Sequence, residues 1–287
     1  MDARLPPNPI PIDDPDDVRI AGYRQVRERD LVGRKGLFVA EGEVVLRVLA
    51  RSTLMRPVSV LIDRKRVEAL APILETLPDA VPVYAAGQAV LDAIVGFHIH
   101  RGILALGRRT VTPTPDDLLA GLPRRAVVVA LFGIANHDNM GGVFRNAAAF
   151  GADAVLLDST CCDPLYRKAI RVSVGAALVM PFAKLAADED ALGLLTHHGF
   201  GAVALSPNGA ITLADLRRAD RAAVLLGAEG PGLPADLLAR ARTIRIPMAG
   251  DFDSLNVATT SGVVLHHLAF VADRLDRASP RPIVLPI

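Results

Sequence analysis

The most constraining feature of this sequence is an uninterrupted apolar segment at 126–132, Ala-Val-Val-Val-Ala-Leu-Phe, which follows Arg125. A strand with apolar residues on both sides of its pleat is buried on both faces, which is typical of a parallel sheet covered by helices. A Gly/Asn-rich loop, a helical pattern through Phe150 and a second apolar strand at 154–158 follow it. This order predicts a βαβ unit and therefore an α/β fold.

Strand-like and helix-like segments alternate on both sides of this unit. Downstream, we predict strands at 201–205, 222–226 and 243–246, then a long apolar helix at 256–274. Upstream, we predict strands at 36–40, 58–62, 82–85 and 102–106, with helices at 43–50 and 64–77. The pattern favours a C-terminal parallel-sheet domain plus a smaller N-terminal α/β domain.

Proline-rich segments indicate where the chain divides. We predict an extended, loosely ordered arm at 1–15, an N-terminal domain at 16–109, a linker at 110–124 with room for one short helix, and a C-terminal domain at 125–287. The polar segment at 16–31 is predicted to be helical, with its cations on the surface.

Composition limits the classes of function. A length of 287 residues suits two domains of about 100–200 residues each. A hydrophobic content of 51% supplies two cores and excludes disorder along the whole chain. The formal net charge of +1 excludes a protein that coats nucleic acid through overall charge, but it allows a local basic surface.

The two cysteines, Cys161 and Cys162, are adjacent. Neighbouring cysteines make neither an ordinary disulfide nor a zinc set, so we expect the reducing cytoplasm. The N-terminus lacks a signal-peptide pattern, and the longest apolar segment, 126–135, has about half the length that crosses a bilayer. No set of His, Cys and carboxylate residues has metal-ligand spacing. We therefore expect no membrane and no metal.

The chemically informative residues follow three predicted strands of the C-terminal domain. In a parallel sheet, the ligand crevice lies outside the carboxyl ends of the strands. The three loops after these strands are therefore expected to form one site.

The first loop, at 136–146, reads Asn-His-Asp-Asn-Met-Gly-Gly-Val-Phe-Arg-Asn. Asn139 is expected to cap the following helix, and Arg145 is expected to fall on its first or second turn. A cation near a helix N-terminus opposes the helix dipole, so Arg145 should face an anionic or electron-rich partner. The alternative is an ordinary strand–turn–helix with a solvated arginine.

The other two loops combine glycines with polar and apolar side chains. The second, at 225–234, places three glycines around Glu229, which could orient Arg145 or bind a cation, or be a solvated side chain on a surface turn. The third, at 246–257, offers Ile246 and Met248 to a flat heterocycle. Ser254 and Asn256 stand where the last helix begins, so helix capping is their alternative role. We interpret His98, His100, His266 and His267 as structural.

Together and in this order, the three loops resemble the three motifs of the SPOUT superfamily, in its SpoU/TrmH-type RNA 2′-O-ribose methyltransferases. The motifs are Asn139-x-Gly141-x-x-x-Arg145, Gly227-Ala-Glu229-Gly-x-Gly232-Leu and Ile246-Pro-Met-x-Gly-x-x-x-Ser254-Leu255-Asn256-Val. Each is weak alone, but three in order over about 120 residues are specific. The segments at 38–42, 100–105 and 163–175 also look like the family, so the resemblance covers nearly everything after Pro15.

The resemblance implies a C-terminal segment threaded through a deep trefoil knot, a homodimer formed through the C-terminal domains, and a ribosomal-protein-like substrate-binding domain at the N-terminus. It implies S-adenosylmethionine bound by the knot loops, with cofactor positions matched by Gly227, Ile246, Met248 and Leu255. Arg145 matches the residue that contacts the ribose hydroxyl, in a site that is completed across the dimer interface. The supporting polar positions of the implied catalytic set match Asn139, Glu229, Ser254 and Asn256.

The chemistry of Arg145 leaves two alternatives. A ribose 2′-hydroxyl must lose a proton during methyl transfer, but an arginine guanidinium normally stays protonated. We therefore interpret Arg145 as a hydrogen-bond donor that stabilises the forming alkoxide or clamps the adjacent phosphate. If Arg145 is the base, its surroundings must lower its pKa strongly.

We expect the substrate to be a structured tRNA or rRNA. A basic cluster at 19–35 is expected to help hold it, through Arg24, Arg27, Arg34 and Lys35, although a merely solvated helix is the alternative. Two other functions stay open: a non-catalytic RNA-binding protein on the same fold, and a Rossmann-type oxidoreductase. The presence of both Arg145 and Asn139 disfavours the first. The missing G-x-G-x-x-G after the strand at 126 opposes the second.

Overall fold

The computed structural model describes residues 9–24, 32–33, 36–95, 102–250 and 254–271. The chain forms two compact units. The first comprises the chain up to Val111 together with Leu165–Val179, and the second comprises Thr112–Pro164 and the described residues from Met180 onward. The sequence placed 165–179 in the C-terminal domain, but helix α7 (Arg167–Val172) of this segment packs against a strand of the first unit.

The first unit is built on a mixed sheet. Its described strands are β1 (Ile10–Ile12), β2 (Leu37–Glu41), β3 (Met55–Asp63), β4 (Val83–Ala86) and β5 (Ile103–Arg109), in the order β1-β4-β3-β5-β2. β1, β4 and β3 run parallel, whereas β5 is antiparallel to both β3 and β2. The helical elements are η1 (Val18–Tyr23), α2 (Glu43–Arg51), η2 (Arg64–Arg66), α3 (Val67–Leu74), α4 (Gln88–Val95), α7 and η3 (Ala176–Leu178). The predicted alternation of strands and helices is therefore confirmed.

The N-terminal segment differs from its prediction in two ways. Ile10–Ile12 forms a strand at the edge of the sheet and Ile12 is buried in the core, so this part of the arm is not loosely ordered. An edge strand tolerates the proline at its centre, because one side of the strand needs no ladder hydrogen bonds. The helix predicted at 16–31 is limited in the described residues to the short 3-10 turn at Val18–Tyr23, and 25–31 lie outside them.

The second unit is built on a fully parallel sheet. Its described strands are β6 (Ala126–Leu131), β7 (Ala154–Leu157), β8 (Phe182–Lys184), β9 (Gly201–Leu205), β10 (Ile211–Thr212), β11 (Arg221–Leu226) and β12 (Arg242–Arg245), in the order β10-β12-β9-β11-β6-β7-β8. Every residue of β6 is buried, as its apolar run predicted, because β6 lies between β11 and β7 in the interior of the sheet.

Helices cover both faces of this sheet. They are α5 (Pro115–Ala120), α6 (His137–Ala149), α8 (Ala191–His197), α9 (Ala235–Arg240) and α10 (Val257–His266), with the short turn η4 (Leu213–Asp215). Residues of α5, α8 and α9 share a core with alternate residues of β6, including Val128, whereas Phe144 of α6 packs edge to face on Phe182. The helix predicted at 256–274 changes after His266 to a π-helical turn, η5 (His267–Val271). No helix in the described part of the chain is long and apolar enough to span a membrane.

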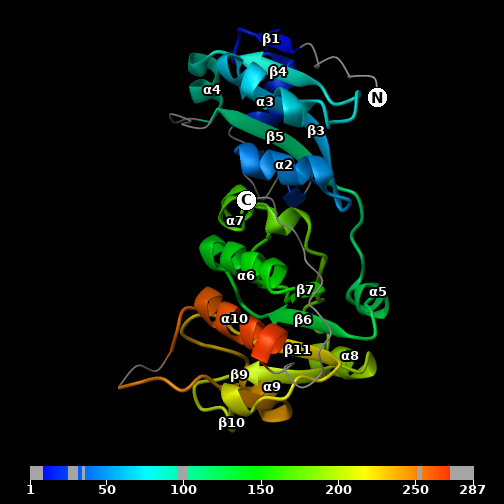
Figure 1. Ribbon diagram of the computed structural model, residues 1–287, viewed down its shortest axis with the longest axis vertical. Helices are drawn as coiled ribbons and strands as arrows, with labels where there is room; N and C mark the ends of the chain where they lie inside the picture. The colour runs from blue at the N-terminus through cyan, green and yellow to red at the C-terminus, as the bar shows by residue number, and fades with distance from the viewer. Residues whose placement is uncertain (1–8, 25–31, 34–35, 96–101, 251–253, 272–287) are drawn as a thin grey trace. The chain divides into compact units, whose positions relative to one another are not determined.

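The close contact between α6 and α10 depends on small residues (Figure 1). A side-chain Cβ at Gly142 would lie 2.6 Å from the Cβ of Ala258, so only glycine allows the observed approach. The Asn146 amide Nδ2 then donates to the Ala258 carbonyl at 2.6 Å and to Ser261 Oγ at 2.9 Å. Gly142 therefore allows α10 to dock on α6.

We therefore expect Gly142→Leu to lower the free energy of unfolding by about 1–3 kcal/mol, because the larger side chain forces α6 and α10 apart. Urea denaturation measures the change. Gly121→Ala is the matched control, since a Cβ there meets nothing nearer than the Asp117 carbonyl oxygen at 3.4 Å. Equal stability of Gly142→Leu and the wild type would contradict the packing argument.

Candidate functional site

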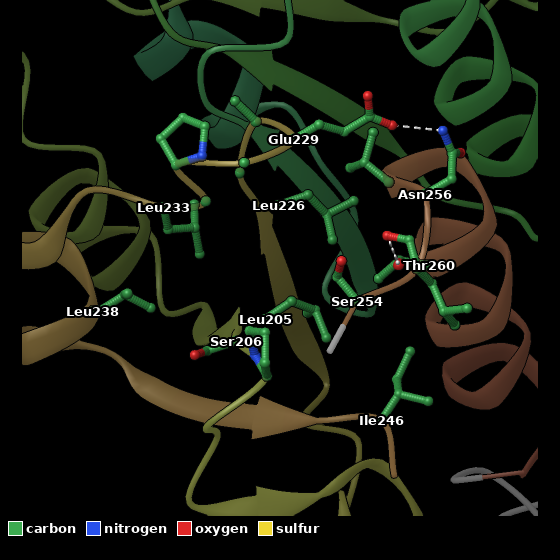
Figure 2. A pocket seen from close by; sticks show the side chains of 18 of the residues that line it. Leu205, Ser206, Leu226, Glu229, Leu233, Leu238, Ile246, Ser254, Asn256 and Thr260 are labelled. Carbon is green, nitrogen blue, oxygen red and sulfur yellow. Dashed lines mark hydrogen bonds between the residues drawn. The ribbon is translucent and has the colours of Figure 1, made fainter. Parts of the chain in front are cut away.

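The loops that the sequence singled out meet at one edge of the second sheet. All seven described strands run parallel, so the loops after β9, β11 and β12 leave from the same edge. Together with the start of α10 they line a pocket of about 590 Å³ (Figure 2). Its apolar lining includes Leu205, Leu226, Leu233, Ile246, Met248 and Leu255, and its polar lining includes Ser206, Glu229, Ser254, Asn256 and Thr260. The second and third loops thus line one pocket, as expected of segments that share a site.

The wall after β11 is a tight glycine turn. The Gly232 N–H donates to the Ala228 carbonyl at 3.0 Å, and these two residues form an isolated antiparallel bridge. Gly230 and Gly232 have φ values of 85° and 71°, which side chains rarely adopt. A Cβ at Gly227 would collide with the backbone of Gly232 and Leu233. The glycines of this motif therefore fix the shape of the pocket wall.

The Asn256 side chain joins the three motifs. Its Nδ2 donates to Glu229 Oε1 at 2.7 Å and to Asn139 Oδ1 at 2.8 Å. Its Oδ1 accepts the backbone N–H groups of Ala258 and Thr259 at 2.9 and 3.2 Å, so Asn256 is also the N-cap of α10. Capping and site assembly are thus two functions of one amide. Figure 2 shows the contact between Glu229 and Asn256 beside the pocket.

Two predictions about the first motif are wrong. The N-cap of α6 is Asn136, whose side chain accepts the Asp138 N–H, whereas Asn139 lies inside the helix with its side chain buried against Asn256. Arg145 is the ninth residue of α6 and so lies on the third turn, beyond the reach of the N-terminal dipole. The error arose because the helix begins at His137, earlier than the glycines suggested.

Arg145 is exposed and does not line the pocket of the described chain. Glu229 was expected to orient Arg145 or bind a cation, but its described contact is to Asn256. The structure thus brings Asn139, Glu229 and Asn256 together and leaves Arg145 outside this group.

All four predicted cofactor positions, Gly227, Ile246, Met248 and Leu255, line the pocket, and Ser254 lines it too. Sequence reasoning missed the contribution of the loop after β9, Leu205-Ser206-Pro207, and of Thr260. The signal for that loop was present, since it also follows a parallel strand and contains a proline–asparagine–glycine turn.

The remaining candidates either have partners away from the pocket or lie outside the described residues. Arg24 is bound within its own unit, to Asp16 at 3.0 Å and to the Asp17 carbonyl at 2.8 Å. Arg27, Arg34 and Lys35 lie outside the described residues, as do His98 and His100. His267 is buried with Nε2 at 3.2 Å from the Leu216 carbonyl, and His266 packs on Phe150, as expected of structural residues.

The two cysteines are free, and neither is an activated nucleophile. Burial raises the pKa of the Cys161 thiol far above its ordinary value and raises the pKa of Cys162 to about 11. Both are therefore protonated at neutral pH, which disfavours chemistry through a cysteine thiolate.

Comparison with known proteins agrees with this geometry. The model of the SpoU rRNA Methylase family matches residues 126–266, a span that begins with β6, ends with α10 and contains all three motifs. A protein of Mycobacterium bovis, named as an uncharacterized tRNA/rRNA methyltransferase, is 38% identical over 262 residues, which cover 88% of this chain and 89% of that protein. The chain belongs to the SpoU methylase family.

Solved structures share the fold of this SpoU-family chain. The AdoMet-bound rRNA methyltransferase from Sinorhizobium meliloti superposes with a TM-score of 0.77 at 22% identity, covering 93% of this chain and 98% of that one. A protein described as an RNA 2′-O ribose methyltransferase superposes with a TM-score of 0.67 at 25% identity, covering 90% and 98%. An α/β fold with a parallel sheet is therefore common to this chain and these methyltransferases.

We expect Asn256→Ser to lower the free energy of unfolding by about 1–3 kcal/mol, because it leaves the buried Asn139 oxygen without its donor. Asn256→Ala should cost about 1 kcal/mol more, since it also removes the helix cap that serine retains. Urea denaturation separates the two contributions, and Asn208→Ser on the exposed loop after β9 is the control. If Asn256→Ser is as stable as the wild type, the three-motif contact does not stabilise the site.

Proposed function

We propose that this SpoU-family protein transfers a methyl group from S-adenosylmethionine to a ribose 2′-oxygen of a structured tRNA or rRNA. The observation that carries the proposal is the contact of Asn256 with Asn139 and Glu229 at the rim of the pocket. The shared fold with an AdoMet-bound rRNA methyltransferase and with an RNA 2′-O ribose methyltransferase supports the cofactor and the acceptor atom, respectively.

The pocket fits S-adenosylmethionine in size and in chemistry. A volume of about 590 Å³ lies within the usual range of about 300–1,000 Å³ for small-ligand pockets. Ile246, Met248 and Leu255 offer an apolar surface to the adenine ring. Gly227 leaves the wall free of a side chain, and the Glu229 carboxylate favours a cationic group nearby.

S-adenosylmethionine, when bound, supplies a methyl group on a positively charged sulfur. The chain must then hold the acceptor oxygen in line with that methyl group, because positioning the reactants supplies several kcal/mol of the rate enhancement. We assign Arg145 to the acceptor side. A guanidinium stays protonated at neutral pH, so it donates hydrogen bonds to the forming alkoxide or to the neighbouring phosphate. Ser254 in the pocket lining and the buried Asn139, which accepts from Asn256, complete the proposed polar set.

We also propose that the site is completed in a homodimer. Arg145 is exposed outside the pocket of its own chain, which fits a role in the pocket of a partner subunit. The C-terminal helix supports this, because α10 and η5 expose Val263, Phe270 and Val271. Such apolar side chains are typical of an interface.

We propose that the C-terminal segment is threaded as a trefoil knot. The strand order supports it: β12 pairs with β9 on one side of β11, while α10, which follows β12, packs against α6. In the proposed knot, the chain passes the loop after β11 between these two elements. The contact of the Asn256 side chain with Glu229 from that loop supports this path.

We propose that the N-terminal domain, predicted at 16–109, selects the RNA through the basic cluster at 19–35. Recognition by shape needs no short sequence motif, so the identity of the nucleotide is set by the fit of the RNA. The enzyme would then act in the cytoplasm, where its two free cysteines stay reduced.

We expect the purified protein, incubated with isotopically labelled S-adenosylmethionine and RNA that lacks the modification, to form 2′-O-methylated nucleosides. Digestion to nucleosides followed by mass spectrometry places the label on the ribose or on the base. A label on the base would overturn the 2′-O assignment. Binding of RNA without any transfer would favour the non-catalytic alternative.

We expect Arg145→Ala to reduce methyl transfer by at least about 10²-fold, as removal of a transition-state hydrogen-bond donor typically does. S-adenosylmethionine binding by calorimetry should change little, because Arg145 is not part of the pocket lining. Arg145→Lys keeps a charged donor and should retain more activity than the alanine variant. Wild-type turnover in Arg145→Ala would exclude this residue.

Mixed dimers test whether Arg145 acts across the interface. Arg145→Ala and the pocket variant Ser254→Phe should each be inactive as homodimers. When the two are co-expressed, one site of each mixed dimer combines an intact pocket with an intact Arg145, so about a quarter of wild-type activity should return. No recovery would mean that Arg145 acts within its own chain.

We expect the double charge reversal Arg27→Glu and Lys35→Glu to weaken RNA binding. The slope of log affinity against log salt concentration should become shallower by about 0.7–0.9 per lost phosphate contact. The matched control is Lys184→Glu, an exposed charge reversal on β8 of the second unit. Affinity measured over a range of salt concentrations gives the slope. An unchanged slope would mean that the cluster is only solvated.

A further inference from the structure

Two histidines and a carboxylate converge in the second unit, and none of them lines the cofactor pocket. His198 Nε2 lies 2.9 Å from Asp116 Oδ1. The rings of His197 and His198 have centroids 5.1 Å apart and are almost perpendicular. One potential ligand atom from each of the three residues lies within 4.8 Å of the other two.

The hydrogen bond between His198 and Asp116 explains why these two side chains lie together, but not why His197 lies near them. His197 is the last residue of α8 and His198 is its C-cap, and a ring nitrogen of His197 also lies near the Asp116 carboxylate on α5. Ligand atoms at about 2.0–2.1 Å from a tetrahedral zinc ion lie roughly 3.4 Å apart. Asp116 and His197 are exposed, so their side chains can rotate to close the remaining distance.

We propose that Asp116, His197 and His198 form a surface site for a divalent transition metal, with Zn²⁺ as the preferred ion. Two imidazoles and one carboxylate are ligands that suit zinc, and water completes the coordination. The histidines lie at the C-terminal end of α8, where the helix dipole favours a positive charge. Motif spacing does not reveal this cluster, because Asp116 and His198 are 82 positions apart in the chain.

The place of this site in the fold indicates a structural role. α5 is the first helix of the second unit, and its apolar face is held by Leu118 and Leu119 in the core. Its C-terminal end is held by Arg221, which donates to the carbonyls of Leu119, Leu122 and Pro123. A metal at Asp116 would fix the first turn of α5 to α8, so that both ends of the helix are held.

Calorimetric titration of the chelator-treated, full-length protein with ZnCl₂ tests the proposal. We expect one ion per chain, with binding weakened about tenfold or more in His197→Ala, His198→Ala and Asp116→Asn. His266→Gln and Asp188→Asn, which change a histidine and a carboxylate outside the cluster, should bind as the wild type does. Visible absorption of the Co²⁺-substituted protein should report nitrogen and oxygen ligands and should be lost in His197→Ala.

His197→Ala keeps the proposal testable if the His198 variant fails to fold, because His197 is exposed and the hydrogen bond between His198 and Asp116 remains. Zinc should also raise the thermal midpoint of the wild type and not that of His197→Ala, since ligand binding stabilises only a chain that holds the site. Equal zinc affinity in the wild type and in His197→Ala would overturn the proposal, as would an equal loss in His266→Gln.

Discussion

The candidate site depends on the hydrogen bonds of the Asn256 side-chain amide. Its nitrogen binds a buried asparagine of the first motif and the glutamate of the second, while its oxygen caps the helix that carries the third. Both of its N–H groups and its carbonyl oxygen are thus engaged. A carboxylate in this position would repel Glu229, and an apolar side chain would leave the Asn139 oxygen unsatisfied. An amide satisfies both requirements at once.

The parallel sheet explains why such a contact can exist. Strands that run in one direction deliver their following loops to one edge, so segments about 120 residues apart in the chain come within hydrogen-bond distance. Two glycines then set how closely these segments approach one another. Gly142 lets α10 approach α6, and Gly227 lets the loop after β11 fold back on itself. Each is a position where a Cβ would strike a neighbouring atom.

The exposed position of Arg145 separates binding from chemistry in the proposed enzyme. The pocket is built within one chain, mainly from the loops after β9, β11 and β12 and the start of α10, whereas the cation assigned to the acceptor lies on the surface of α6. The proposed homodimer would complete a site divided in this way. It would also cover the exposed apolar side chains on α10 and η5.

The sequence by itself determined the α/β class, the buried apolar run at 126–132, several residues that line the pocket and the family, because apolar runs and motif spacing are local signals. Tertiary structure decided what local signals do not contain. Asn139 was predicted to be a helix cap but is a buried acceptor, because the helix begins two residues before it, at His137, and its cap is Asn136. The strand at Ile10–Ile12 and the cluster of Asp116 with His197 and His198 arise from pairing between distant segments, and only the folded chain brings those residues together.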